Sequence, residues 1–392
     1  MKKINIDGTE YVIESDAQEV DYSGNVIGAT NVKDALDALQ HAVEIGGGAG
    51  DMSQYGYYGI YFPKQMSLIK TVLDATASAD YPRLRFVHIS DSHGPDIGHA
   101  DSLLENTAAD FAAHTGDAVL GQYDYDGGFS TLISEMVACT KPFYLALGNH
   151  DCLNSPSLEA RFTKYIQPLN EHNGLTGNTK TYYSVNYTKQ GERHESRFKC
   201  IFLDQAEAGY WPHGQDRATD WAVVNMSDEQ VVWFIQELQE AQTNSRHVLI
   251  FLHTAPDTTT NRIFGWFDFD EPAIYDTGDL IMDIVNAFKT GGSYEYKGTT
   301  YSFSGSGTFV AYFCGHTHSD SYGYMAKYPN QFCCTTCRPY AQSDAGDGTF
   351  NSGYPQINYF TVDYQSRKLS LYRVGEQRTW QGTERVSFYI KY

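Results

Sequence analysis

The chain has 392 residues, of which 41% are hydrophobic, so it is long enough for one large core and an appendage. Its formal net charge of −20 at pH 7 argues against the broad basic face that duplex nucleic acid requires, although a local basic pocket stays open. No run of about eighteen apolar residues is present and the chain does not start with the apolar stretch of a signal peptide, so we expect neither a membrane span nor that route of export.

The first predicted element is a β-hairpin. Ile4–Ile6 and Tyr11–Ile13 alternate apolar and polar residues on either side of Asp7-Gly8, a pair that is typical of tight primed turns. We assign residues 1–45 to a small N-terminal domain that contains this hairpin and a following helix.

That helix is predicted to run to about Glu44, with Thr30 or Asn31 as its cap. Its apolar residues recur at the spacing of a coiled-coil seam, and they are Val32, Leu36, Leu39 and Val43. A helix this short is marginal alone, so we expect the seam to be buried on its own domain or on other copies of the chain. An ordinary amphipathic helix fits the spacing about as well.

Residues 46–82 are predicted to connect this domain to the rest of the chain. Gly46–Gly50 reads as a flexible linker, and the stretch from Tyr57 to Tyr81 is aromatic and then helical, with Pro63 suited to a first turn. The main domain is assigned to residues 83–392, with insertions at 152–226 and 257–305.

Five apolar runs of the main domain end in polar residues that can bind metals. We predict a buried strand for each run, followed at its carboxyl end by the polar residues. The runs are Phe86–His93, Ala113–Asp117, Phe143–Asp151, His247–His253 and Phe309–His318. Phe129–Ala138 reads as a crossover helix, and the capping box Ser227–Gln230 opens another helix before the fourth run. This strand, helix, strand pattern predicts an α/β fold.

The segments between these elements are predicted to be less regular. Residues 152–197 and 205–226 are rich in Gly, Asn and Tyr and read as loops over the strand ends, while 257–305 contains Trp266, Phe267 and Phe269. The many tyrosines fit sheet faces or a groove for sugars. Tyr359–Tyr364 and Leu369–Val374 predict a closing hairpin. Seven irregularly spaced cysteines, including the pair Cys334 and Cys337, predict free or buried thiols rather than a disulfide framework or a zinc knuckle.

The residues at the strand ends predict a metal centre. Two carboxylates, one amide and four imidazoles are too many ligands for one divalent ion and suit two ions if one carboxylate bridges them. These ligands are Asp91, His93, Asp117, Asn149, His253, His316 and His318. The mixture of oxygen and nitrogen favours Mn, Fe, Zn, Co or Ni over Ca or Mg.

The same motifs resemble the calcineurin-like metallophosphoesterase family from about Arg83 to Val374. The matching motifs are Asp91-x-His93, Gly116-Asp117, Gly148-Asn149-His150-Asp151, His253 and Gly315-His316-x-His318. The resemblance implies a two-layer sandwich of mixed sheets that is flanked by helices and carries two metals at the strand ends. Two such ions polarise phosphoryl oxygens and activate water, so no side-chain nucleophile is needed.

The resemblance also implies a role for each residue. Asp91, His93 and His318 would hold the first metal, Asn149, His253 and His316 the second, and Asp117 would bridge. His150 would contact the phosphate and assist the leaving oxygen. Many members of the family place an Asp, paired with this histidine, where this chain has Leu120. Asp151 or a carboxylate of a loop is then the candidate partner of His150.

Residues Val20–Leu39 resemble a short module of bacteriophage tail and appendage proteins, which are often trimeric. The resemblance implies a virion location, other tail proteins as partners, and a homo-oligomer. It favours a virion hydrolase that cleaves a phosphodiester polymer of the host surface, such as a teichoic acid. Arginines of the insertions are candidates for offsetting repulsion between this polyanion and the acidic chain, and they are Arg161, Arg193, Arg217 and Arg262.

Two alternatives remain at this stage. One is a cytoplasmic nuclease or nucleotide phosphodiesterase with the same fold, and the other is a non-catalytic receptor-binding module. The complete ligand set argues against the second alternative.

Overall fold

The computed structural model describes residues 2–6, 9–13, 83–94, 97, 99–119, 126–154, 157–187, 197–207, 226–256, 272–318, 320–336, 340–342, 350–375 and 387–392. The chain divides into two compact units, Met1–Ala79 and Asp80–Tyr392. In the first unit, β1 (Lys2–Ile6) and β2 (Thr9–Ile13) pair antiparallel, which confirms the predicted hairpin. The predicted helix at 31–44, the glycine linker and the connector helix lie outside the described residues.

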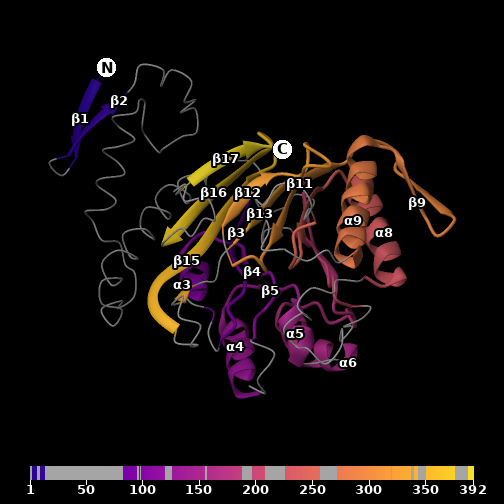
Figure 1. Cartoon of the computed structure of the whole chain (residues 1–392), viewed down its shortest axis with the longest axis horizontal. Helices are drawn as coiled ribbons and strands as arrows, with labels where there is room; N and C mark the ends of the chain where they lie inside the picture. Colours follow the sequence, from indigo (N-terminus) through magenta and orange to yellow (C-terminus); the bar gives the residue numbers. More distant parts are fainter. Residues whose placement is uncertain are drawn as a thin grey trace. The chain divides into compact units, whose positions relative to one another are not determined.

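The second unit is built on two mixed β-sheets (Figure 1). The first sheet has seven strands. Its parallel strands are β3 (Arg83–Ile89), β4 (Phe111–His114) and β5 (Phe143–Leu145), and β5 forms one edge of the sheet. Antiparallel strands extend it beside β3, and they are β14 (Tyr340–Gln342), β15 (Phe350–Asp363), β16 (Lys368–Gly375) and β17 (Ser387–Lys391). The β15–β16 pair confirms the predicted closing hairpin.

The second sheet has six strands, four of which run parallel at its centre. In order across the sheet, these strands are β13 (Phe332–Thr335), β11 (Thr308–Cys314), β8 (His247–Phe251) and β7 (Phe198–Phe202). Antiparallel strands β12 (Ser321–Tyr324) and β6 (Tyr183–Tyr187) form its two edges. The carboxyl ends of the parallel strands therefore collect the polar residues that end the apolar runs.

Phenylalanines join the two sheets face to face. Phe86 of β3 stacks on Phe111 and Phe360 of its own sheet, each at 5.1 Å between ring centroids. Its ring also meets Phe251 and Phe313 of the other sheet edge-on, at 5.4 and 5.0 Å. All five rings are buried, and contacts of this kind add to the hydrophobic stabilisation. This packing confirms the predicted two-layer sandwich.

Helices flank both sheets, as the fold prediction requires. The six-stranded sheet is covered by α8 (Asp228–Thr243) and α9 (Pro272–Thr290), which lie side by side in Figure 1. The seven-stranded sheet contacts α3 (Ala100–Asn106) and α7 (Gln167–His172). The other helices of the described residues are α4 (Asp126–Ala138), which confirms the predicted crossover helix, α5 (Asn149–Asn154), α6 (Leu158–Arg161) and the π-helix η3 (Phe162–Ile166).

The predicted loops at 152–197 are wrong for much of that range. Residues 158–172 form α6, η3 and α7, and β6 then joins the second sheet. Their polar composition conceals a buried face, which contains Tyr165, Ile166, Leu169, Tyr182 and Tyr183. These tyrosines are core residues, so they do not form a surface for sugars. Residues 188–196 and 208–225 of the predicted loops lie outside the described part.

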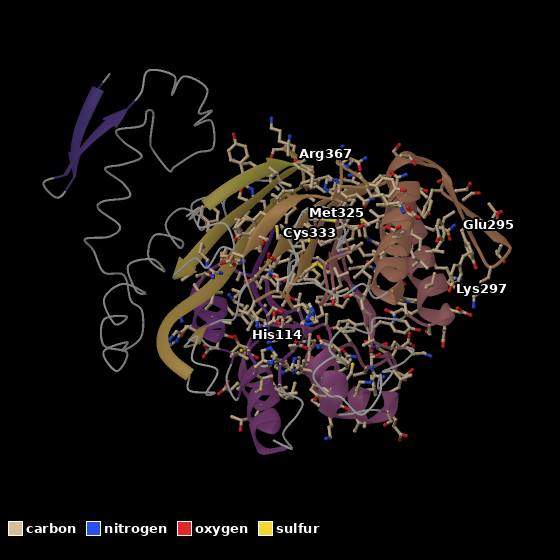
Figure 2. All side chains as sticks on the ribbon, viewed as in Figure 1. His114, Glu295, Lys297, Met325, Cys333 and Arg367 are labelled. Atoms are coloured by element: carbon tan, nitrogen blue, oxygen red, sulfur yellow. The ribbon has the colours of Figure 1, made fainter. Side chains whose placement is uncertain are left out.

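The second half of the predicted insertion at 257–305 is part of the packed fold. Helix α9 buries Ile281, Met282, Val285 and Phe288 in the same hydrophobic cluster as α8 and the sheet. A hairpin of β9 (Ser293–Tyr296) and β10 (Thr299–Ser302) follows, and Figure 2 labels Glu295 and Lys297 near its tip. The aromatic run Trp266–Phe269 lies outside the described residues.

Six cysteines of the described residues are free and buried, among them Cys334, in agreement with the predicted thiols. Cys337 lies outside the described part. No helix of the described residues combines the length and the apolar character that a membrane crossing needs.

Candidate metal centre

The seven predicted ligands lie at one edge of the sandwich because they follow the carboxyl ends of parallel strands from both sheets. Backbone hydrogen bonds tie these strand ends together. The Asp91 N–H donates to Gly116 O at 2.9 Å, the His93 N–H to Asp117 O at 3.0 Å, and the Gly315 N–H to His253 O at 2.9 Å. The ligands therefore project from a cross-linked backbone and not from independent loops.

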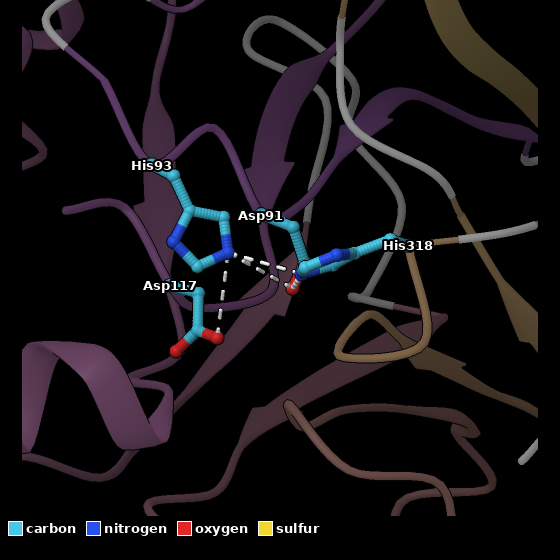
Figure 3. A group of neighbouring side chains, drawn as sticks. All are labelled: Asp91, His93, Asp117 and His318. Carbon is cyan, nitrogen blue, oxygen red and sulfur yellow. Dashed lines mark hydrogen bonds and ion pairs between the residues drawn. The ribbon is translucent and has the colours of Figure 1, made fainter. Parts of the chain in front are cut away.

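The first ligand group consists of Asp91, His93, Asp117 and His318 (Figure 3). The Nε2 atoms of His93 and His318 are 3.0 Å apart, and the His318 Nε2 lies 3.3 Å from Asp91 Oδ1. His93 Nε2 is 3.8 Å from Asp117 Oδ2. Four ligand atoms from three strand ends thus converge on one small volume.

The second group contains His253 and His316, again with Asp117, and the side chain of Asn149 contacts both histidines. His253 Nε2 lies 3.0 Å from both Asn149 Oδ1 and His316 Nδ1, and these last two atoms are also 3.0 Å apart. Ligand bonds of about 2.1 Å at right angles place donor atoms about 3.0 Å apart. The spacing of this group therefore fits a first-row divalent ion.

Asp117 belongs to both groups through one oxygen atom. Its Oδ2 is 3.1 Å from His253 Nε2 in the second group and 3.8 Å from His93 Nε2 in the first. Its Oδ1 accepts the backbone N–H of His150 at 2.8 Å, which fixes the rotation of the carboxylate. This is the arrangement that the bridging role of Asp117 requires.

The hydrogen bonds behind the ligands set which atoms face the centre. His253 Nδ1 lies 2.7 Å from Thr115 O, so it carries a proton and Nε2 is the ring nitrogen directed at the centre. His253 Nε2 faces oxygens of Asn149 and Asp117. Burial alone would lower the pKa of His253, but the anionic Asp117 outweighs it and raises this pKa to about 9, so Nε2 binds a proton or a metal cation in its place. Asp91 Oδ1 is buried and accepts no hydrogen bond from the described residues. The oxygen atoms of Asp91, Asn149 and Asp117 thus direct lone pairs into the centre, and a cation there would stabilise them. The residues present therefore suit two metal ions.

The two carboxylates of the centre are ionised. Burial alone would raise the pKa of Asp117, but the neighbouring His253 and His150 outweigh it and hold this pKa well below its ordinary value. The pKa of Asp91 is also lowered, because His318 outweighs the effect of burial. Burial and the neighbouring His253 lower the pKa of His316 to about 3, so its ring is neutral. Anionic carboxylates and neutral imidazoles are the forms that bind metals.

The backbone of the centre is unusual, because five ligand residues have positive φ. The angles are 54° at Asp91, 45° at His93, 53° at Asp117, 68° at His316 and 52° at His318. Glycine allows the strand ends to approach closely. A Cβ on Gly116, where φ is 95°, would lie 2.6 Å from His253 Nδ1, and a Cβ on Gly315 would overlap Ser90 Oγ and Asp91 Oδ2.

His150 lies beside both ligand groups. Its ring meets that of His93 edge-on at 4.5 Å between centroids, and its Nε2 is 3.8 Å from Asp117 Oδ2. Its side chain is 7% exposed, whereas that of His318 is 31% exposed, so the centre meets solvent at His318 rather than at His150. Leu120, where the sequence departs from the family pattern, lies outside the described residues.

Asp151 has a role that the sequence did not indicate. Its carboxylate accepts backbone N–H groups from Asp117, Ala118, Val119 and Gly148, at 2.8–3.3 Å. The sequence makes Asp151 a candidate partner of His150, but its oxygens are directed at these amides instead. It fixes the loop that carries Asp117. The only signal in the sequence was its place in the Gly148–Asp151 motif.

Comparisons with known proteins show the family and the fold. A family profile described as calcineurin-like phosphoesterase matches residues 84–320. A dimetal phosphatase from Danio rerio superposes with a TM-score of 0.54 and 12% identity, covering 79% of this chain and 99% of that one.

GAP50, the anchor in the inner membrane complex of Plasmodium, gives a TM-score of 0.46 at 12% identity, over 79% of this chain and 88% of that one. A metallophosphoesterase from Sphaerobacter thermophilus gives a TM-score of 0.29 at 13% identity, covering 75% of this chain and 89% of that one. No curated protein matched by sequence.

Proposed function

Because the chain belongs to the calcineurin-like phosphoesterase family, we propose that it is a bacteriophage virion enzyme that hydrolyses phosphodiester bonds in a polymer of the host surface, such as a teichoic acid. The main observation in favour of hydrolase activity is the pair of ligand groups that share Asp117 Oδ2. The preference for diesters, the polymer and the virion are the further parts of this proposal.

Each ligand residue has a place in the proposed reaction. Asp91, His93 and His318 would hold one divalent ion, Asn149, His253 and His316 the other, with Asp117 between them. When bound, two such ions polarise phosphoryl oxygens and lower the pKa of water at the site. The protein supplies the anionic charge of Asp91 and Asp117, the fixed proton on His253 Nδ1, and a buried setting in which these interactions are strong.

His150 is proposed to act on the leaving oxygen. Its Nε2 lies near Asp117 Oδ2 and its ring contacts His93, so it is directed at the volume between the ligand groups. A histidine here can hydrogen-bond a phosphoryl oxygen and give a proton to the departing alkoxide. General acids of this kind contribute roughly 10²–10⁴-fold to a rate.

The proposed substrate follows from the amino terminus of the chain. The resemblance of Val20–Leu39 to phage tail modules supports a virion location, and an enzyme on a virion meets its substrate outside the cell. The net charge of −20 opposes binding to a polyanion, so local cations must offset it. Arg161 cannot serve, because it is buried and lies 3.7 Å from Asp204. Arg193, Arg217 and Arg262 lie outside the described residues.

The experiment that tests this function has two steps. Elemental analysis of the purified chain is expected to find about two divalent ions per chain, and bis-p-nitrophenyl phosphate is expected to be cleaved faster than p-nitrophenyl phosphate. The chain is then incubated with purified teichoic acids, and released fragments are followed by mass spectrometry. Rapid cleavage of DNA or cyclic nucleotides, with every wall polymer intact, would replace the proposed substrate by nucleic acid or nucleotides.

We also propose that residues 1–45 oligomerise, as a trimer, through Val32, Leu36, Leu39 and Val43. The coiled-coil spacing of these residues and the resemblance to trimeric tail parts support this. Sedimentation of the whole chain is compared with that of a chain starting at Asp51. A trimer that becomes a monomer on truncation is expected, and monomers in both cases would refute the proposal.

A further inference from the structure

We propose that His114 is a positioning residue whose imidazole joins the loop after β3 to the loop after β4 and so sets the distance between Asp91, His93 and Asp117. The inference rests on the proposed metal centre and not on the proposed substrate. His114 ends β4 and is fully buried, and Figure 2 labels it.

The hydrogen bonds of His114 use both ring nitrogens. The Gly116 N–H donates to Nδ1 at 3.2 Å. Nδ1 is therefore an acceptor, which places the ring proton on Nε2. That atom lies 3.0 Å from Ser92 Oγ and donates to it, and the Ser92 hydroxyl in turn donates to Ala118 O at 3.1 Å. Every donor in this chain of hydrogen bonds has one acceptor, so one tautomer satisfies all of them.

The residues that this chain of hydrogen bonds joins to His114, directly or through Ser92, are the immediate neighbours of three ligands. Ser92 lies between Asp91 and His93, and Gly116 and Ala118 flank Asp117. All three ligands have positive φ, a conformation that persists only where the surroundings hold it. Two backbone hydrogen bonds also join these loops, from the Asp91 N–H to Gly116 O and from the His93 N–H to Asp117 O. The ring of His114 thus completes a closed set of contacts between the two loops.

A neutral ring is needed for this role. A protonated Nδ1 would present a second N–H to the Gly116 N–H, and the two donors would repel one another. Burial lowers the pKa of His114 to about 4, so the ring is neutral near pH 7.

His247 is a matched control because it is also a buried, neutral histidine. It begins β8, whereas His253 follows the other end of that strand, and its Nδ1 pairs with the Tyr392 hydroxyl at 2.8 Å. Burial lowers the pKa of His247 to about 3. Replacing it removes a comparable ring at a position distant from the ligands along the strand.

The test compares His114→Phe, Ser92→Ala and His247→Phe in the full chain. Affinity for Co²⁺ is measured by competition with a chelator, and the coupling between two bound Mn²⁺ ions is read from the electron paramagnetic resonance spectrum. Residues that orient metal ligands typically change metal affinity by about 10–100-fold. We expect a loss of that size in His114→Phe, a smaller loss in Ser92→Ala, and the wild-type affinity and spectrum in His247→Phe.

The double variant of Ser92 and His114 is expected to lose no more than His114→Phe alone, because the two residues act through one chain of hydrogen bonds. If His114→Phe fails to fold, Ser92→Ala decides. Wild-type affinity and spectrum in Ser92→Ala and, where it folds, His114→Phe would overturn the inference, as would equal losses in His114→Phe and His247→Phe. A chain that binds two ions but cleaves no phosphoester would refute the proposed function and leave this inference standing.

Discussion

At the scale of single residues, Asp117 is the ligand that both metal sites share. One of its oxygens faces both ligand groups, and the other is held by the backbone of His150. Asp117→Asn keeps the shape but replaces an anion by a neutral amide. We expect at least one ion to be lost and hydrolysis to fall by more than about 100-fold, since even residues behind the ligands change activity by 10–100-fold.

Metal content and bis-p-nitrophenyl phosphate turnover measure this effect, with Asp101→Asn as the control because Asp101 is an exposed carboxylate of α3. Full activity and full metal content in Asp117→Asn would contradict the shared-ligand assignment.

Gly315→Ala is predicted to disable the centre without altering a ligand. The new Cβ would overlap Asp91 Oδ2 and Ser90 Oγ, so Asp91 would have to move. We expect loss of the first metal and an activity reduced by about 10–100-fold. Gly177→Ala is the control, because nothing lies within 4 Å of its added Cβ. Equal metal content in both variants would show that the strand ends can separate without harm.

The metal-binding residues could be predicted from the sequence because each of them follows an apolar run. Their arrangement into two groups came from the family resemblance. The supporting residues were not predicted, because their roles depend on contacts between strands distant in sequence. Asp151 and His114 act on backbone amides of a neighbouring loop, and no spacing in the chain signals such a contact.

At the scale of elements, the start of α8 differs in an instructive way from its prediction. Ser227 accepts the Gln230 N–H at 3.1 Å, as a capping box requires. Gln230 does not return the bond, since its side chain contacts Asp204 and Glu207 instead. Glu207 itself accepts the Ser227 N–H at 3.2 Å. A residue from another loop thus completes the cap, and only the local half of the motif was predictable.

Ser227→Ala is therefore expected to destabilise the fold by about 1–2 kcal/mol, the upper range for loss of a cap, because it also removes the hydroxyl bond to Glu207. Ser157→Ala, which removes the exposed cap of the four-residue helix α6, is expected to cost about 0.5 kcal/mol. Guanidinium denaturation compares the two. A larger effect at Ser157 would show that the contact with Glu207 contributes nothing.

Strands were predicted more reliably than helices for a physical reason. A buried strand in a parallel sheet is apolar at nearly every residue, as in Val248–Phe251, and stands out from its surroundings. The helices α6 and α7 are short and interrupted by a π-helix, which breaks the period of their buried residues. That is why residues 158–172 read as a loop.

At the scale of the whole molecule, buried neutral histidines make stability depend on pH. The pKa of His247 is lowered by burial, with Arg367 and Arg197 adding to the effect, to about 3 from an ordinary value of 6.5. Its ring stacks on that of Tyr364 at 4.1 Å between centroids, and its Nδ1 forms a hydrogen bond with the Tyr392 hydroxyl. Between pH 6.5 and 3 the unfolded chain binds a proton that the folded chain does not. Stability contributed by the neutral ring is therefore lost as pH falls below 6.5.

The expected loss from this histidine is about 2 kcal/mol between pH 7.5 and 5, at about 1.4 kcal/mol for each pH unit below 6.5. Chemical denaturation at both pH values is compared for the wild type and His247→Phe. The variant is expected to be less stable at pH 7.5 but to lose about 2 kcal/mol less on acidification. Parallel losses in the two proteins would show that His247 takes up its proton in the folded state.

The positive φ angles of the ligand residues limit where such a centre can be built. An L-residue in the left-handed region costs roughly 1 kcal/mol or more, so the five ligands together carry on the order of 5 kcal/mol of conformational cost. Folded domains have a net stability of only about 5–15 kcal/mol. Grafting these side chains onto a small scaffold would therefore fail even with every ligand atom in place. A designer must transplant the two aromatic-packed sheets as well, because their cohesion is what makes the distorted strand ends tolerable.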